Sequence, residues 1–172
     1  MRIARRTTRP GNGSSYVRRG LALLLVIVAA LGVSMTTQTP AMAAGSGCGA
    51  ACDGKEPSTY IATVDGSQGI CGLVGASTIY AATNVELRYS SYCQTAWARQ
   101  TGSLGWLTGV LVESYNANGT LRRTYTSDTS PGAWSFMVND KGITARACFF
   151  QYNNDADQEA GRRTIIACTG RY

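Results

Sequence analysis

Six cysteines limit what this chain can fold into more than any other feature of its sequence. All of them fall in the later part of the chain, as Cys48, Cys52, Cys71, Cys93, Cys148 and Cys168. An even number of cysteines in an exported chain predicts a disulfide framework. A zinc site is the rival interpretation, because Cys48 and Cys52 have a C-x3-C spacing, but the usual C-x2-C partner pair is missing. We therefore expect about three disulfides and no metal.

The first 43 residues predict that the chain is exported. They contain Arg2, Arg5, Arg6, Arg9, Arg18 and Arg19 and no acidic residue. The apolar run LALLLVIVAALGVSM follows, and small residues then surround Ala41 and Ala43. This order is that of a secretory signal peptide, and the run is too short for a retained membrane anchor. We expect cleavage near Ala43 by the general secretory route, an extracellular location, and membrane contact only during export.

The charge balance argues against a nucleic-acid partner. The whole chain has a net charge of +6, from 16 basic and 10 acidic residues. The predicted signal peptide contains six of the arginines and none of the acids, so residues 44–172 carry ten charges of each sign. Binding to nucleic acid depends on a cationic surface that displaces counterions. A chain without net charge gives no reason to expect it.

The sequence contains no histidine. Histidine is the usual general base near neutral pH and the commonest metal ligand. Oxidation of the cysteines would also leave no thiolate nucleophile. We therefore expect no enzymatic activity and no cofactor. A hydrolase that uses carboxylates or a bound metal is a weaker alternative.

Short strand-like segments between Gly, Asn and Asp turns predict one all-β domain over residues 44–172. The segments are residues 60–64, 77–83, 85–90, 106–115, 120–127, 133–139, 143–152 and 163–168. Turn residues at 116–119 and 140–142 predict two β-hairpins. The one helical candidate is SYCQTAWARQ, residues 91–100. We expect a small monomeric antiparallel sandwich or barrel with at most one short helix.

Hairpin geometry predicts one cysteine pair. The strand-like segments ARACFFQY and RRTIIAC flank the polar run NNDADQEAG, and Cys148 and Cys168 lie symmetrically about Gln158. Directly opposed strand residues bring their Cβ atoms close enough for a disulfide. We therefore predict a Cys148–Cys168 bond. The pairing of the four amino-terminal cysteines stays open.

The segment VELRYSSYCQTAWARQ, residues 85–100, contains a candidate recognition surface. Strand side chains alternate between faces, so Glu86 and Arg88 share one face while their apolar neighbours take the other. Arg99 follows Trp97 by two residues and could join them. Two interpretations are open for these four residues: a solvated face beside a disulfide-stapled core, or a polar recognition surface with an aromatic flank.

Basic residues near cysteines suggest a protease-inhibitor loop. Lys55 lies beside Cys52, and Arg162 and Arg163 lie near Cys168. A disulfide keeps such a loop rigid and lowers the entropic cost of binding. The other interpretation is that all three are solvated turn charges.

Acidic residues in the run NNDADQEAG form a weak calcium candidate. Asp155, Asp157 and Glu159 alternate there and could offer oxygen ligands. An EF-hand loop starting at Asp155 would need glycine at its sixth position and glutamate at its twelfth, where this chain has Ala160 and Ile166. A solvated hairpin loop is the simpler interpretation.

The opening CGAACDGKEP, a third cysteine and the core VELRYSSYCQTAWAR closely resemble the YjfA-like family of secreted bacterial domains of unknown function. The matching positions are Cys48, Cys52, Gly54, Lys55, Glu56, Pro57, Cys71, Glu86, Leu87, Arg88, Tyr89, Ser90, Cys93, Ala96, Trp97 and Arg99. The resemblance is dense over residues 48–99 and only general over residues 100–172. It implies export and disulfides, and it assigns no catalytic residues. Some members resemble outer modules of membrane-tethered DNA-binding regulators, but this chain shows no DNA-binding portion, so we do not carry that role over.

These observations predict a secreted, non-enzymatic binding module whose partner is an unknown protein or a cell-envelope glycan. Trp106 and Trp134 could line a carbohydrate or peptide platform, although such residues more often pack in a core. A secreted protease inhibitor is the leading alternative.

Overall fold

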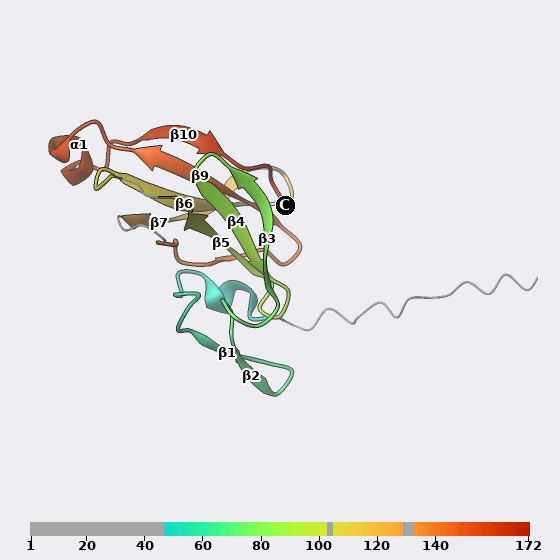
Figure 1. The fold of residues 1–172 in the computed structure, drawn as a ribbon. Helices are drawn as coiled ribbons and strands as arrows, with labels where there is room; N and C mark the ends of the chain where they lie inside the picture. Colours follow the sequence, from blue (N-terminus) through green and yellow to red (C-terminus); the bar gives the residue numbers. More distant parts are fainter. Residues whose placement is uncertain (1–46, 103–104, 129–132) are drawn as a thin grey trace, which may run out of the picture. The chain divides into compact units, whose positions relative to one another are not determined.

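Antiparallel sheets account for most of the regular structure (Figure 1). The computed structural model describes residues 47–102, 105–128 and 133–172, so the predicted signal peptide, residues 1–43, lies outside the described residues. Sheet 1 has the order β3-β4-β5-β8, from β3 (Ala76–Ala82), β4 (Val85–Ser90), β5 (Thr95–Gln100) and β8 (Val138–Asn139). Sheet 2 has the order β10-β9-β6-β7, from β6 (Thr108–Tyr115), β7 (Leu121–Asp128), β9 (Thr144–Gln151) and β10 (Thr164–Cys168).

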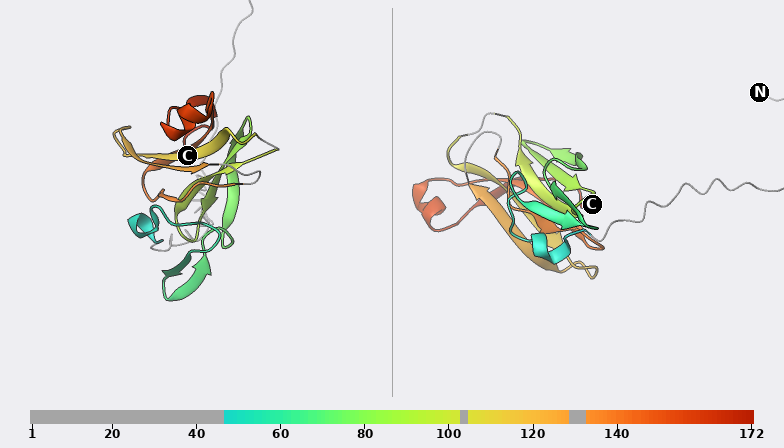
Figure 2. Two further views of the ribbon diagram at one scale, coloured as in Figure 1. Left: turned by 90° about the vertical axis from the view of Figure 1, so that its left-hand side faces the viewer. Right: turned by 90° about the horizontal axis from the view of Figure 1, so that it is seen from below.

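Sheets 1 and 2 face each other across a shared apolar core (Figures 1 and 2). Val85 and Leu87 of β4 are fully buried, and they pack in one cluster with Val110 and Val112 of β6 and with Ala147 of β9. Strand side chains alternate, so one face of β4, β5, β6 and β9 enters this core. The predicted all-β antiparallel fold is confirmed, and it takes the form of a sandwich.

A smaller unit precedes the sandwich, and we call residues 47–75 the amino-terminal module. It contains a 3-10 turn, η1 (Gly49–Cys52), and a two-stranded hairpin of β1 (Ile61–Val64) and β2 (Ser67–Ile70). Two disulfides hold it, Cys48–Cys52 within the module and Cys71–Cys93 to the turn between β4 and β5. These bonds give the pairing that the sequence left open.

The third disulfide joins the two strands at one edge of sheet 2. Cys168 of β10 lies directly opposite Cys148 of β9, and their sulfurs are bonded. The register shifts once between Ile165 and Ala167, which is a bulge in an otherwise regular antiparallel pair.

The helix predicted for residues 91–100 is wrong. This segment forms a turn followed by β5, which pairs with β4 on one side and with β8 on the other. Ala96 and Ala98 enter the core while Trp97 points to the opposite face, which is the period of a strand. Ala, Gln and Arg favour helices in isolation, but pairing on both edges overrides that preference.

The hairpin predicted at residues 140–142 is also wrong. β8 pairs with β5 in sheet 1, whereas β9 pairs with β6 and β10 in sheet 2, so this turn crosses from one sheet to the other. Most of the strand predicted for residues 133–139 is irregular, with one isolated bridge at Trp134 before β8. The hairpin predicted at 116–119 is confirmed, because it joins β6 to β7.

The polar run between β9 and β10 contains one short helix, α1 (Asp155–Glu159), where the sequence predicted only a loop. Asn154 begins it by accepting a hydrogen bond from the backbone N–H of Asp157, as asparagine often does at this position. Within the described residues, no helix is long and apolar enough to cross a membrane.

Candidate functional site

The outer face of sheet 1 brings the four predicted surface residues together. In the register between β4 and β5, Glu86 lies opposite Arg99 and Arg88 lies opposite Trp97. These side chains point away from the core that Leu87 and Ala98 enter. The pairing of β4 with β5 therefore places a carboxylate, two guanidinium groups and an indole side by side on one face of sheet 1.

A polar network holds the charged side chains in place. Arg99 donates two hydrogen bonds to Oε2 of Glu86, from Nε at 3.0 Å and from Nη2 at 2.6 Å. Thr78 on β3 donates to the same carboxylate at 3.0 Å and accepts from Nη1 of Arg88 at 2.9 Å. The charge of Arg99 is therefore paired with that of Glu86.

Arg88 differs from Arg99 in its charge balance. Among the described residues it forms no ion pair, and its contact with Thr78 is to a neutral hydroxyl. Burial lowers the pKa of Arg88 from its ordinary value, the nearby positive charge of Arg99 lowers it further, and Glu86 opposes both. Arginine stays protonated in proteins, so two guanidinium cations share the single carboxylate of Glu86.

Two tryptophans stand beside the arginines. Trp97 is buried and packs against the disulfide-rich core of the amino-terminal module. Trp134 is 36% exposed, and its backbone forms an isolated antiparallel β-bridge with that of Arg99. Its indole N–H donates to the Glu56 carboxylate. Glu56 also accepts from the Ser58 hydroxyl at 3.1 Å. The exposed indole is thus held by a carboxylate that is itself fixed.

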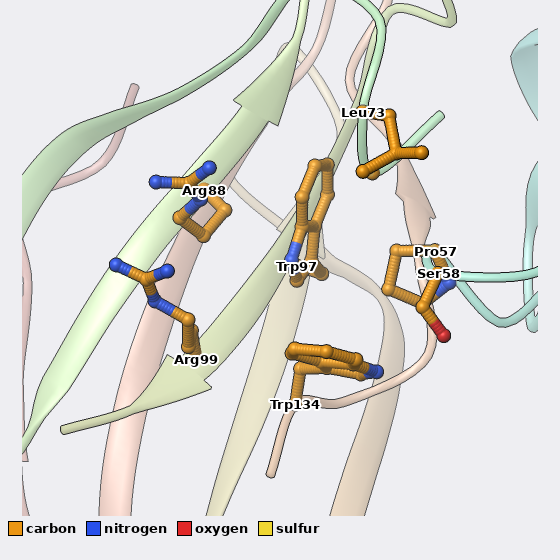
Figure 3. A pocket seen from close by; sticks show the side chains of 8 residues that line it. Pro57, Ser58, Leu73, Arg88, Trp97, Arg99 and Trp134 are labelled. Atoms are coloured by element: carbon orange, nitrogen blue, oxygen red, sulfur yellow. The ribbon is translucent and has the colours of Figure 1, made fainter. Parts of the chain in front are cut away.

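These residues line a pocket of about 150 Å³ between sheet 1 and the amino-terminal module. We call it the Trp–Arg pocket, and its lining is Pro57, Ser58, Gly72, Leu73, Arg88, Trp97, Arg99 and Trp134. Figure 3 shows the two guanidinium groups on one side of the Trp97 ring, with Pro57 and Leu73 on the other. Charge therefore concentrates at one end of the pocket and apolar surface at the other.

Backbone contacts close the module side of the pocket. The N–H of Gly72 donates to the carbonyl of Pro57 at 2.8 Å. A Cβ atom at position 72 would lie 2.6 Å from that carbonyl oxygen, so the close approach requires glycine. The pocket wall is therefore a tight contact between two loop segments.

The chemistry of the lining suits binding better than catalysis. Among the described residues that line the pocket there is no carboxylate, and Ser58 provides the one hydroxyl. The nearest acids, Glu56 and Glu86, are engaged by Trp134 and Arg99. A carboxylate-dependent hydrolase needs a pair of acids facing a cleft, and this pocket has none in its lining.

The predicted inhibitor residues lie apart from one another along the chain and in the fold. Lys55 is exposed in the amino-terminal module and lies 5.7 Å from the centre of the Tyr60 ring. Arg162 forms an ion pair with Asp157, and Arg163 lies 5.2 Å from the centre of the Phe150 ring. Both arginines lie between α1 and β10, and Lys55 belongs to a separate candidate loop in the amino-terminal module.

The three acids proposed as a weak calcium site do not form a cluster that could hold an ion. Asp155, Asp157 and Glu159 all lie on α1, and Asp157 is occupied by Arg162 at 2.9 Å. In the described part of the chain, the one group of side chains close enough to hold a metal ion consists of Cys48, Cys52, Cys71 and Cys93. Their sulfur atoms lie within 4.8 Å of one another. The structure pairs these cysteines in two neighbouring disulfides.

Two aspartates outside the pocket went unnoticed in the sequence. Both oxygens of Asp53 accept hydrogen bonds from Arg122, and one also accepts from the backbone N–H of Asn139. Asp140 is 7% exposed, and neither of its carboxyl oxygens has a hydrogen-bond partner among the residues that the structure describes. Burial raises the pKa of Asp140 to about 7. No local motif marks either residue, because their partners and burial come from distant segments.

Sequence reasoning also missed most of the pocket wall. Pro57 and Leu73 were not among the predicted site residues, and Trp134 was considered only as one half of an aromatic platform with Trp106. Trp106 is 63% exposed and does not line the pocket.

Comparisons with known proteins place the chain in a family. A search of curated proteins and a search of solved structures found no match. Nothing confirms the resemblance to the YjfA-like family, which stays a prediction. One family model, described as a protein of unknown function (DUF2690), matches residues 50–148, and this range includes the whole lining of the Trp–Arg pocket. The match covers more than half of the chain, so this protein belongs to the DUF2690 family of proteins of unknown function.

Proposed function

We propose that this protein is a secreted, non-enzymatic binding module that captures a cell-envelope component in the Trp–Arg pocket. One observation carries the proposal: two tryptophans and two arginines line one pocket, and no acid is among the described residues that line it. Ligand sites commonly combine apolar and aromatic walls with a few fixed polar groups. The three disulfides favour an oxidising, extracellular location.

The rigidity of the pocket supports this proposal. Arg88, Trp97 and Arg99 lie on two paired strands, and the polar network with Glu86 and Thr78 fixes both guanidinium groups. A site whose side chains are already ordered loses less conformational entropy when a ligand binds. The disulfide between Cys71 and Cys93 anchors the opposite wall to the turn that joins the same two strands.

A protease inhibitor has less support. The backbone of Lys55 is engaged within the protein, since its N–H donates to Cys52 at 3.1 Å and its carbonyl accepts from Met137 at 2.8 Å. An inhibitory loop would need those groups to pair with a protease. The side chains of Arg162 and Arg163 contact Asp157 and Phe150.

Affinity capture from the envelope fraction tests the binding proposal. The exported, oxidised protein should retain a specific component, and Trp134→Ala should lose it. Trp106→Ala is the matched control, because this tryptophan is more exposed and lies outside the pocket. Equal capture by all three proteins, or conversion of the captured component into product, would contradict the proposal. Stoichiometric inhibition of a trypsin-like protease that disappears in Lys55→Ala or Arg163→Gln would favour the inhibitor.

A further inference from the structure

The charge in the Trp–Arg pocket points to an anionic ligand group. Arg99 is paired with Glu86, but the described residues provide no carboxylate within ion-pair distance of Arg88. A guanidinium group has five N–H donors, and among the described residues Arg88 uses one of them, toward Thr78. Arg88 therefore has donors left for a ligand, and its fork geometry suits a planar carboxylate as well as a phosphate.

The size of the pocket sets the size of the rest of the ligand. Its volume of about 150 Å³ is below the range of roughly 300–1,000 Å³ that drug-sized ligands occupy. It accommodates one ring-sized group. The wall opposite the arginines is apolar, from Pro57 and Leu73, and the ring of Trp134 is partly exposed beside it. A flat group with an apolar face fits this arrangement.

The backbone of the pocket favours a sugar over a peptide. A peptide carboxyl terminus is usually held by free backbone N–H groups. Here the N–H of Gly72 already donates to Pro57, and that of Ser58 faces the Glu56 carboxylate. β5, which carries Trp97 and Arg99, pairs on both sides. Side chains are thus the main contacts that remain, and an aromatic ring with a charged donor is sufficient for an acidic sugar.

We infer that the Trp–Arg pocket binds a single sugar ring that carries a carboxylate, with the ring against Trp134 and the carboxylate on Arg88. This inference rests on the proposed function and names the chemical class of its ligand. Arg99 has a positioning role: its pairing with Glu86 keeps the carboxylate of the protein away from the ligand. The apolar end formed by Pro57 and Leu73 receives the C–H face of the ring.

Titration with small probes tests the inference. Glucuronate and glucose differ at one carbon, where the former has a carboxylate and the latter a hydroxymethyl group. We expect glucuronate to shift the indole N–H resonance of Trp134 in NMR spectra of the oxidised protein and to bind at least tenfold tighter than glucose. Arg88→Gln should remove that preference, whereas Arg163→Gln, an exposed arginine elsewhere, should keep it.

Additional variants and probes distinguish a wrong inference from a misfolded variant and from a wrong proposed function. Arg88→Lys should retain part of the preference, and thermal unfolding of both Arg88 variants reports whether the fold is intact. Equal binding of glucose and glucuronate, or an unchanged preference in folded Arg88→Gln, would overturn the inference. Binding of the dipeptide Ala-Ala in place of glucuronate would overturn it in favour of a peptide terminus. If envelope capture needs Trp134 but is not displaced by glucuronate, the inference fails while the proposed function survives.

Discussion

The sandwich and the amino-terminal module are stabilised in different ways. Sheets 1 and 2 bury a continuous apolar core in which Val85, Leu87 and Val112 are fully inaccessible. The module has one hairpin of two four-residue strands, and Leu73 at its edge is 73% exposed. An isolated two-stranded hairpin is marginally stable in water. Disulfides and packing on the sandwich therefore hold the module in place.

The two walls of the Trp–Arg pocket come from these two regions, so they are stabilised in different ways. The arginines and Trp97 come from strands of the sandwich, while Pro57 and Leu73 come from the module. Loss of the module should therefore abolish binding and leave the sandwich folded. Loss of the sandwich core should abolish both.

The largest expected effect is on the sandwich core. Leu87→Ala removes a fully buried side chain, and we expect the free energy of unfolding to fall by about 3–4 kcal/mol. Leu73→Ala is the matched control in the module, where the same truncation of an exposed side chain should cost less than about 0.5 kcal/mol. Denaturant unfolding measures both. Similar losses for the two variants would remove the distinction between the regions.

The second effect is on the module alone. Alanine substitution of both residues removes the Cys71–Cys93 bond, which closes a loop with a sequence separation of 22. In the chain-entropy model, this bond contributes about 3 kcal/mol to the free energy of unfolding, and the variant should lose that contribution. Hydrogen exchange should speed up in β1 and β2, stay slow in β6 and β9, and accompany loss of ligand capture. The matched double variant at Cys48 and Cys52, with a separation of 4, should have a smaller effect. Equal loss of protection in β6 would show that the module and the sandwich unfold together.

The sequence predicted the elements whose signals are local. The alternation in residues 85–90 gave β4, the Asn and Gly residues at 116–119 gave the hairpin between β6 and β7, and symmetry about Gln158 led to the Cys148–Cys168 pair that the structure contains. The segment at 95–100 failed because its residue types favour a helix, whereas the strands on both sides decide its conformation. The crossing at 140–142 failed because a tight-turn signal does not say which sheet receives the next strand.

The candidate site was also predictable only where its residues lie close together in the sequence. Strand alternation was enough to suggest a shared face for Glu86 and Arg88, and Trp97 and Arg99 were added because they follow within 14 consecutive positions. Their neighbours across the pocket, such as Pro57 and Trp134, lie far away along the chain. Packing of the module on sheet 1 brings Pro57 close, and a backbone bridge to Arg99 does so for Trp134. A single sequence contains no signal for either contact.

The third prediction concerns the polar link between the two regions. Asp53 in the module accepts from Arg122 on β7 at 2.6 Å and from the N–H of Asn139 on β8 at 2.7 Å. Asp53→Ala leaves Arg122 without its partner, and we expect a loss of about 2 kcal/mol. Glu159→Ala, an exposed acid on α1, should change stability by less than about 0.5 kcal/mol. Denaturant unfolding compares the two variants, and equal stabilities would show that the link contributes nothing.

The pH dependence of this link has a defined sign. Burial alone would raise the pKa of Asp53, but hydrogen bonds from Arg122 and Asn139 outweigh it and hold the pKa below its ordinary value. The folded state therefore binds the proton less tightly than the unfolded state. The contribution of Asp53 is present above the ordinary pKa of 3.8 and is lost as the pH falls below it.

A pH-dependent effect of opposite sign is expected at Asp140, between β8 and β9. Its buried carboxyl has no hydrogen-bond partner, and burial raises its pKa from 3.8 to about 7. The folded state binds this proton more tightly than the unfolded state, so the contribution of Asp140 to stability falls between about pH 4 and pH 7 and is level above that. Asp140→Asn removes the charge and keeps the shape, so at pH 8 it should be more stable than the wild type.

Unfolding free energies of the wild type and of Asp140→Asn, measured from pH 4 to pH 8, provide the test. The two curves should lie close together at the acidic end, where Asp140 is protonated in the folded state and only partly ionised in the unfolded state, and separate as the pH approaches 7. Because both proteins keep Asp53 and its partners, the difference between the curves isolates the sandwich carboxyl from the link to the module. Parallel curves would mean that Asp140 titrates normally, and its burial without a partner would then carry no energetic cost.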